Sequence, residues 1–223
     1  MTRRMIWPVL FGIGGVAILV SLGVWQVQRL GWKEAVLADI ETRISAPPVA
    51  IPEAPDAEAD AYLPVEATGR LGADHVRVLV SQRGQGAGYR VISALDTGAR
   101  RILVDRGVMP TEAAPPVHQG RVTVTGNLHW PEEVDRFTPG NDLARNIWYS
   151  RDVDALADRL GTEPVLVIAR GMSETDAPVT PLPVDTSAIP NDHLNYAITW
   201  FSLAALWLGM TVYLLWRIRQ RTV

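Results

Sequence analysis

Cysteine is absent from the 223 residues of this chain. Without it, an exported domain has no disulfide framework and must be held together by packing alone. The absence also argues against copper transfer, which requires soft sulfur ligands. Methionine does not replace cysteine here, because the five methionines lie far apart, at positions 1, 5, 109, 172 and 210.

Catalytic motifs are also lacking. The chain has no G-x-S-x-G nucleophile elbow, and its four histidines fall in different predicted elements: His75, His118, His129 and His193. No two of them have the spacing of a structural zinc site. We therefore predict that the protein is not an enzyme, although an acid–base pair among its many Asp and Glu residues stays open. For His75, His118 and His129 we expect solvated or capping roles.

A surplus of positive charge is the third missing feature, since the formal net charge is −3. All 24 acidic residues lie between positions 26 and 195, whereas five of the 21 basic residues lie outside this range. This balance argues against a nucleic-acid partner, because phosphate binding requires a basic face.

The sequence does contain two long apolar runs. Ile6 to Trp25 and Tyr196 to Trp216 carry no charge, and a helix of about 20 residues spans the roughly 30 Å of bilayer hydrocarbon. We predict two transmembrane helices in contact with membrane lipid. A cleaved secretory signal is the alternative for the first run, since Arg3 and Arg4 precede it. The length of the run and the lack of a small-x-small cleavage site favour a retained helix.

The basic residues predict an orientation. Lys and Arg near short membrane ends stay in the cytoplasm, and five arginines flank the outer ends of the two runs: Arg3, Arg4, Arg217, Arg219 and Arg221. Arg29 and Lys33, at the other end of the first run, weaken this bias. We predict that both termini are cytoplasmic and that the central domain is periplasmic.

The central portion has the pattern of an antiparallel sheet or small barrel. Apolar residues alternate with polar ones between Gly, Asp and Pro punctuation, which predicts strands at residues 62–71, 74–81, 88–95, 100–109, 120–130 and 164–170. An amphipathic helix is expected over 150–161, with Ser150 or Asp152 as its N-cap and Gly161 at its end. The connections are too short for the crossover helices of a doubly wound fold.

The predicted fold class is therefore an α+β membrane protein, in which two transmembrane helices flank a periplasmic, mainly antiparallel β domain with a short helix. An amphipathic helical continuation follows the first run, and prolines then make the chain extended. The predicted parts are a cytoplasmic tip and first transmembrane helix (1–25), an amphipathic continuation and Pro-rich linker (26–61), the β-rich domain (62–173), a Pro-rich return linker (174–192), the second transmembrane helix (193–216) and a basic cytoplasmic tail (217–223).

One candidate site lies at the start of the second run. If the helix begins shortly before Tyr196, then His193, Ala197 and Trp200 share one face at i, i+4 and i+7, with Tyr196 alongside. Imidazole is a usual axial ligand for haem iron. Small or aromatic neighbours suit the flat macrocycle.

A similar stripe is expected on the first helix, where Trp25, Arg29, Trp32 and Lys33 lie at the same membrane level. Arg and Lys pair with carboxylates, so these cations suit haem propionates. A second interpretation is equally physical, because Trp and Tyr form interfacial belts and Arg and Lys snorkel to the headgroups. The residues alone leave both interpretations open.

Four separated blocks resemble, in order, the surfeit locus protein family. They are "LGVWQVQRLGWK" (22–33), "GYRV" (88–91) with "ILVDRGVMP" (102–110), "NIWYSRDVDALA" (146–157) and "PNDHLNYAITWF" (190–201). Members of this family are two-helix membrane proteins that assist the assembly of cytochrome c oxidase. The first block supplies the motif residues Gly23, Trp25 and Gln26, whereas Asp105 and Val108 depart from the Asn and Trp of many members.

The resemblance implies a chaperone in a bacterial inner membrane that binds haem a near the outer surface and assists its insertion into the core catalytic subunit of cytochrome c oxidase. Haem a synthase is a second expected partner. His193 would be the axial ligand of the haem iron, as in alphaproteobacterial members. The other expected haem contacts are Arg29 and Lys33 for the propionates, and Trp25, Tyr196 and Trp200 as walls of the slot.

We expect the exported domain to dock the client, with residues 106–110, "RGVMP", as an exposed contact loop. One alternative is a haem-independent membrane chaperone that stabilises the immature core subunit, in which His193 only caps or anchors the second helix. An exported sensor is a third alternative, which the short cytoplasmic tails disfavour.

Overall fold

The computed structural model describes residues 3–82, 86–186 and 189–220. It contains two compact units. The two ends of the chain, Met1–Asp39 and Thr186–Val223, form one unit, and Ile40–Asp185 form the other. The second unit takes in the segment 46–61 and most of the segment 174–192, which the sequence analysis assigned to Pro-rich linkers.

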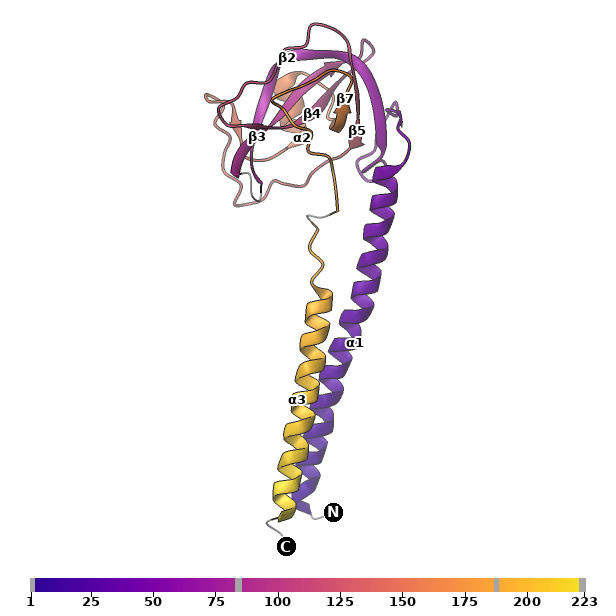
Figure 1. Cartoon of the computed structure of the whole chain (residues 1–223), viewed down its shortest axis with the longest axis vertical. Coiled ribbons are helices and arrows are strands. Elements are labelled where there is room, and N and C mark those ends of the chain that lie inside the picture. The colour runs from indigo at the N-terminus through magenta and orange to yellow at the C-terminus, as the bar shows by residue number, and fades with distance from the viewer. Residues whose placement is uncertain (1–2, 83–85, 187–188, 221–223) are drawn as a thin grey trace. The chain divides into compact units, whose positions relative to one another are not determined.

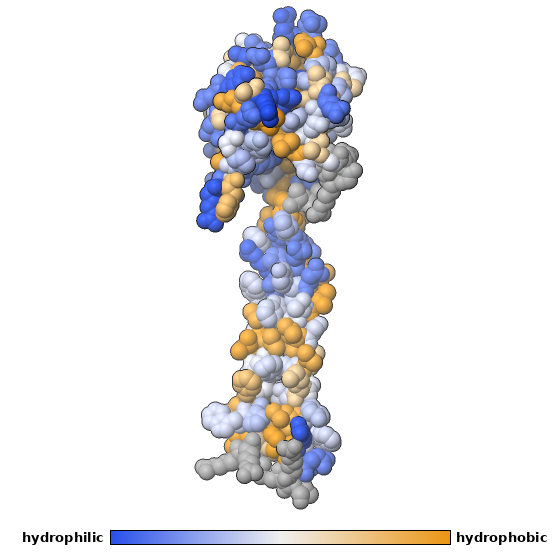
Figure 2. Space-filling model, turned by 90° about the vertical axis from the view of Figure 1, so that its left-hand side faces the viewer, coloured by the Kyte–Doolittle hydropathy of each residue, from blue (hydrophilic) through white to orange (hydrophobic). Residues whose placement is uncertain are grey.

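The first unit is a pair of helices. Helix α1 extends from Arg3 to Ser45 and helix α3 from His193 to Gln220, and α3 lies alongside the N-terminal part of α1 (Figure 1). Both are long and apolar enough to cross a bilayer, which confirms the prediction of two candidate spans. At about 1.5 Å per residue α1 is roughly 65 Å long, so the predicted amphipathic continuation belongs to the same helix. Figure 2 shows bands of apolar side chains on the outside of this pair.

Glycines allow the two helices to approach closely. A Cβ atom added at Gly12 would lie 2.2 Å from Cγ2 of Thr211, and one added at Gly23 would lie 2.7 Å from Cε1 of Phe201. The buried residues of α3 are both alanines. Small residues at the contact are typical of helix pairs in membranes, where association depends on close packing. The opposed positions also show that the helices are antiparallel.

The second unit is a closed barrel. Five strands follow one another in the sheet: β2 (Pro64–Gln82), β3 (Gly86–Asp96), β4 (Arg101–Pro110), β7 (Leu166–Met172) and β5 (Val122–Leu128). The barrel closes because β5 also pairs with β2. Two short strands, β1 (Val49–Ala50) and β6 (Ile147–Trp148), pair with β2 in parallel. The sheet is mixed, since β4 and β7 are also parallel, while the other pairs around the barrel are antiparallel.

Strand β2 differs from its prediction. The sequence predicts two strands, 62–71 and 74–81, but the chain continues as one strand whose register with β3 shifts between Leu71 and His75. Such a bulge bends a strand and increases its twist. The bend allows the first half of β2 to pair with β5 and the second half with β6.

Strand β4 lies at the centre of the hydrophobic core. Leu103 belongs to a cluster with Leu156 and Leu160 of helix α2 (Val153–Leu160), whereas Val104 belongs to a second cluster with Val124 of β5. Both faces of β4 are therefore buried, which explains its continuous apolar run. Helix α2 begins and ends as predicted, because the Asp152 side chain accepts a hydrogen bond from the backbone N–H of Ala155 and Gly161 adopts a left-handed φ of 63°.

The expectation of an exposed contact loop at residues 106–110 is wrong. These residues complete β4, and only 3% of Arg106 and 1% of Met109 is exposed. Gly107 has a φ of 121°, and a Cβ atom there would lie 2.1 Å from the carbonyl oxygen of Thr180. The returning chain thus covers this part of β4.

Candidate functional site

The helix pair carries a polar contact at the start of α3. The ring Nδ1 atom of His193 lies 2.8 Å from the side-chain Oε1 atom of Gln26 on α1. Gln26 is only 8% exposed, and His193 is half-buried as the first residue of its helix. Because a buried carboxamide requires a hydrogen-bond partner, this contact explains how α1 accommodates a glutamine at its interface with α3.

The contact determines which ring nitrogen of His193 can bind a ligand. An amide oxygen only accepts hydrogen bonds, so Nδ1 of His193 must carry the donated proton. In the neutral imidazole the lone pair is then on Nε2, which is the atom available to a metal. A hydrogen bond to the other ring nitrogen is the usual way in which proteins fix the orientation and tautomer of a metal-binding histidine.

The aromatic residues of the predicted site differ in exposure. Trp25 and Tyr196 are 54% and 56% exposed, whereas Trp200 is partly buried. Trp200 is seven residues after His193, nearly two helical turns, so both lie on the side of α3 that faces α1. Trp25 and Tyr196 present their rings at the surface of the pair.

The two predicted cations lie on α1 beyond Gln26. Arg29 is exposed and places its guanidinium 3.9 Å from the ring centroid of Trp32 on the same helix. Lys33 is partly exposed. They follow Gln26 by three and seven residues, which is about 5 Å and 10 Å along the helix axis. Both cations therefore lie further along α1 than the contact with His193.

The role of Gln26 was missed by sequence reasoning, which quoted it only as part of a motif. A signal was present, because Gln26 and Gln28 are uncharged polar residues near the end of an apolar run. Helical periodicity places Gln26, but not Gln28, on the side of Gly12 and Gly23. The identity of its partner could not be found in this way, since His193 is 167 residues away.

Two histidines of the barrel unit do not have the solvated or capping roles that were predicted for them. The His118 side chain is 5% exposed, with Nε2 2.9 Å from Oδ1 of Asp176 and Nδ1 3.0 Å from Oε2 of Glu174. Burial by itself lowers the pKa of His118, but the hydrogen bonds to these two carboxylates outweigh it and raise the pKa above its usual value. Arg106 also binds Asp176, so the cluster holds the returning chain against β4.

His129 has the opposite electrostatic environment. Its ring stacks on Tyr62 with a centroid distance of 5.2 Å. Burial, followed by the nearby charge of Arg151, lowers the pKa of His129 to about 4. The ring is therefore neutral at physiological pH, and its role is packing.

Asp105, which departs from the Asn of many family members, is likewise an internal residue. Its carboxylate is fully buried and forms ion pairs with Arg90 and Arg151. Arg151 also binds Glu133. This network joins β3, β4 and the segment before α2, and so has a structural role.

Comparison with known proteins gives consistent matches over both units. Residues 14–205 match the model of the SURF1 family. Surfeit locus protein 1 of Rattus norvegicus is 32% identical over 212 residues, covering 83% of this chain and 68% of that protein. The Homo sapiens protein of the same name is 33% identical over 212 residues, with coverages of 83% and 70%. A SURF1-like protein of Monosiga brevicollis is 34% identical over 217 residues, with coverages of 87% and 82%.

Proposed function

This chain belongs to the SURF1 family, and we propose that it is a membrane assembly factor for haem-a-containing cytochrome c oxidase. In this proposal the helix pair holds haem a as cargo near the outer membrane surface and assists its insertion into the core catalytic subunit. Family membership supports the general assembly role. The geometry around His193 supports the role of haem.

The contact between His193 and Gln26 is the observation that carries the haem proposal. It fixes the proton on Nδ1 and leaves the Nε2 lone pair for iron. Within the described residues, no group of three or more His, Cys, Asp or Glu side chains is arranged to hold a bare metal ion. Haem iron needs no such group, because the porphyrin supplies four ligands and the protein only the axial ones. The donor set therefore fits a haem.

The other residues of the site would orient and release the cargo. Arg29 and Lys33 would contact the propionates as charge-assisted partners, and Trp25, Tyr196 and Trp200 would contact the faces and edge of the macrocycle. A single axial histidine and two surface cations would bind haem with limited affinity. Limited affinity suits a carrier that must later release its cargo.

The location follows the same proposal. The protein would lie in a bacterial inner membrane, with both termini in the cytoplasm and the barrel unit in the periplasm. The core catalytic subunit would be its client, haem a synthase the donor of its cargo, and membrane lipid its surroundings. The proposal assigns no catalytic step to the chain.

A haem-independent chaperone is the second candidate function. The same contact between His193 and Gln26, together with the close approach at Gly12 and Gly23, would then serve only to hold two helices against the immature core subunit. In that case the exchange of His193 for another residue that pairs with Gln26 would leave assembly intact.

Reduced-minus-oxidised absorption spectra of membranes test these functions. Three strains are compared: the parent, one lacking this protein, and one carrying His193→Asn, which retains a side-chain amide that can pair with Gln26. Loss of the haem a signal in the deletion strain supports the assembly role, and loss in His193→Asn supports the haem carrier. A normal signal in His193→Asn favours the chaperone, and a normal signal in the deletion strain refutes both.

A further inference from the structure

An apolar groove follows one side of the helix pair below the proposed haem site. Its upper part has a volume of about 360 Å³ and is lined by Gly15, Ile18 and Leu19 from α1 and by Leu203, Leu206 and Trp207 from α3. A lower part of about 660 Å³ shares Trp207 and Met210 with it and continues towards Trp7 and Leu214. The linings of both parts are almost entirely apolar.

The side of α3 that lines the groove extends along the helix to His193. Trp207 follows Trp200 by seven residues, and Trp200 follows His193 by seven, so the three lie on one slowly turning stripe of α3. Tyr196 precedes Leu203 by the same spacing. The wall of the groove on α3 thus leads directly to the proposed axial ligand.

Helix α1 has a similar stripe of residues on one side. Trp25 follows Ile18 by seven residues, and Arg29 follows Trp25 by four, so the three share one side of the helix. Ile18 and Leu203 line the groove together. The surface residues Trp25 and Tyr196 are therefore on the side of the pair on which the groove opens.

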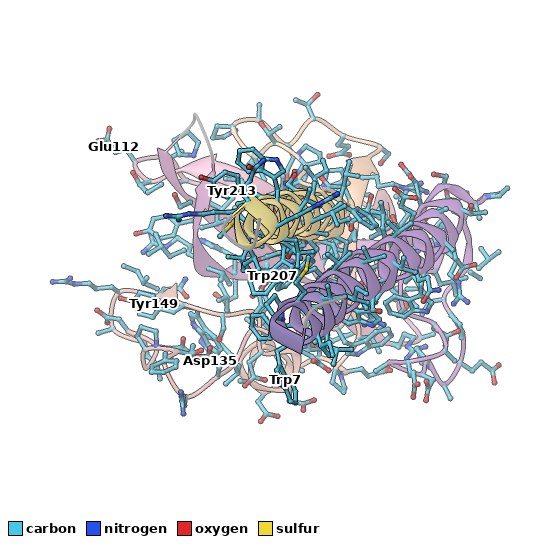
Figure 3. All side chains as sticks on the ribbon, turned by 90° about the horizontal axis from the view of Figure 1, so that it is seen from below. Trp7, Glu112, Asp135, Tyr149, Trp207 and Tyr213 are labelled. Carbon is cyan, nitrogen blue, oxygen red and sulfur yellow. The ribbon has the colours of Figure 1, made fainter. Side chains whose placement is uncertain are left out.

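Trp207 packs against Gly15 in the upper groove. The indole Nε1, Cε2 and Cζ2 atoms of Trp207 are the atoms closest to Gly15. Figure 3, viewed from below, shows Trp207 between α1 and α3. The lining of the upper groove is almost entirely apolar, so an apolar occupant fits it best.

The distance from the haem site to Trp207 matches an isoprenoid chain. Gln26 and Gly15 are 11 residues apart, which is roughly 16 Å along α1. An extended farnesyl chain has a similar length, and haem a carries such a chain on its porphyrin ring. The chain would begin at the level of His193 and end near Trp207.

We propose that this groove binds the hydroxyethylfarnesyl chain of the cargo haem and so selects farnesylated haems over haem b. This inference rests on the proposed haem-binding function and adds its specificity determinant. The residues that determine specificity are Ile18, Leu203 and Trp207. A lipid acyl chain or a helix of another protein are the competing occupants.

The test compares haem o with haem b, because these two differ only in the farnesyl-bearing substituent. The full-length protein in lipid nanodiscs is titrated with each haem, and Kd is measured from the Soret absorbance. Two variants fill the groove, Leu203→Trp and Ile18→Trp. Leu208→Trp is the matched control, since Leu208 is 52% exposed, close to the 41% of Leu203, but lines neither part of the groove.

We expect the ratio of the haem b Kd to the haem o Kd to fall about tenfold in both groove variants and to change less than about twofold in the control. Each haem also partitions into the lipid of the nanodisc, which changes its apparent Kd. This effect is the same for all variants, so it cancels when the ratio is compared between them. Unchanged haem b binding in the groove variants shows that the axial site is intact.

Two results would overturn the inference in distinguishable ways. If the wild-type protein binds haem b and haem o equally, or if the groove variants keep the wild-type ratio, another occupant fills the groove while the haem-binding proposal stands. If the wild-type protein binds neither haem, the haem-binding proposal fails and this inference fails with it.

Discussion

Arg106 and Asp176 form a buried, bidentate ion pair across 70 residues of sequence. Nε of Arg106 donates to Oδ2 of Asp176 at 2.9 Å, and Nη2 donates to Oδ1. Removing one partner leaves the other charge buried without compensation, which typically costs 3–5 kcal/mol. We predict that Asp176→Ala lowers the free energy of unfolding by about this amount, measured by chemical denaturation in detergent. Arg145→Ala is the control and should cost less than about 0.5 kcal/mol, because its ion pair with Asp142 is largely exposed.

His118 should make the stability of the protein decrease at alkaline pH. Its pKa is higher in the folded than in the unfolded chain, so the folded state binds the proton more tightly. The stabilisation is then complete below the unfolded pKa of about 6.5 and is lost as pH rises through the folded pKa. Thermal unfolding between pH 6 and 9 should show this loss in the wild-type protein and a smaller one in His118→Gln. Equal slopes in the two proteins would contradict the prediction.

His129 should act in the opposite direction at acid pH. Its pKa is lowered from 6.5 to about 4 in the folded protein, so the unfolded chain binds the proton more tightly. Stability is complete above about 6.5 and is lost as pH falls towards 4. At about 1.4 kcal/mol per pKa unit, the loss is on the order of 2 kcal/mol after allowance for the partial exposure of the ring. His129→Phe keeps the stacking on Tyr62 and should remove this loss, whereas NMR titration of the wild-type ring should give a midpoint near 4.

Gln26 should determine haem affinity without touching the haem. Replacing a residue that orients a metal ligand typically costs 10–100-fold in affinity. We predict a loss of this size in Gln26→Leu, measured by titration with haem b, and partial recovery in Gln26→Glu, which keeps an acceptor for Nδ1 of His193. Gln28→Leu makes the same chemical change at an exposed position of α1 and should have no effect. Full affinity in Gln26→Leu would refute the orienting role of Gln26.

Gly12 should control the approach of α1 and α3. Its added Cβ atom would meet Thr211, whereas a Cβ atom at Gly14 has no neighbour within 4 Å. Gly12→Val should therefore separate the helices or destabilise them by about 1–3 kcal/mol, and Gly14→Val should not. Because the chain has no cysteine, the separation can be measured from bifunctional maleimide cross-linking of Leu19→Cys to Leu203→Cys. A similar cross-linking yield in the two glycine variants would refute this account of the packing.

Features set by neighbouring residues could be predicted from the sequence. The two apolar runs, the helical continuation of the first run and both caps of α2 depend on local composition and spacing. The strand positions were also found in outline, because alternation identifies a half-buried strand. These features need no knowledge of which segments meet in space.

Features that depend on distant partners could not be predicted. Arg106 is predicted to lie in an exposed contact loop, whereas its burial depends on distant partners such as Asp176 on the returning chain. The parallel pairing of β4 with β7 and the partner of Gln26 are equally long-range. At the candidate site, the side of α3 that carries His193 was predicted correctly from helical spacing, but the residue facing it on α1 was not.

The pairing of β5 with β2 also limits how the barrel unit can recognise a partner. Where the described strands pair on both sides, as β5 does with β2 and β7, their backbone N–H and C=O groups are engaged, and such paired segments offer no edge to an incoming strand. These segments therefore cannot bind a partner by strand addition, which relies on the backbone and tolerates many sequences. Recognition there depends on side chains and loops, and the pairing also protects this disulfide-free domain from edge-to-edge aggregation.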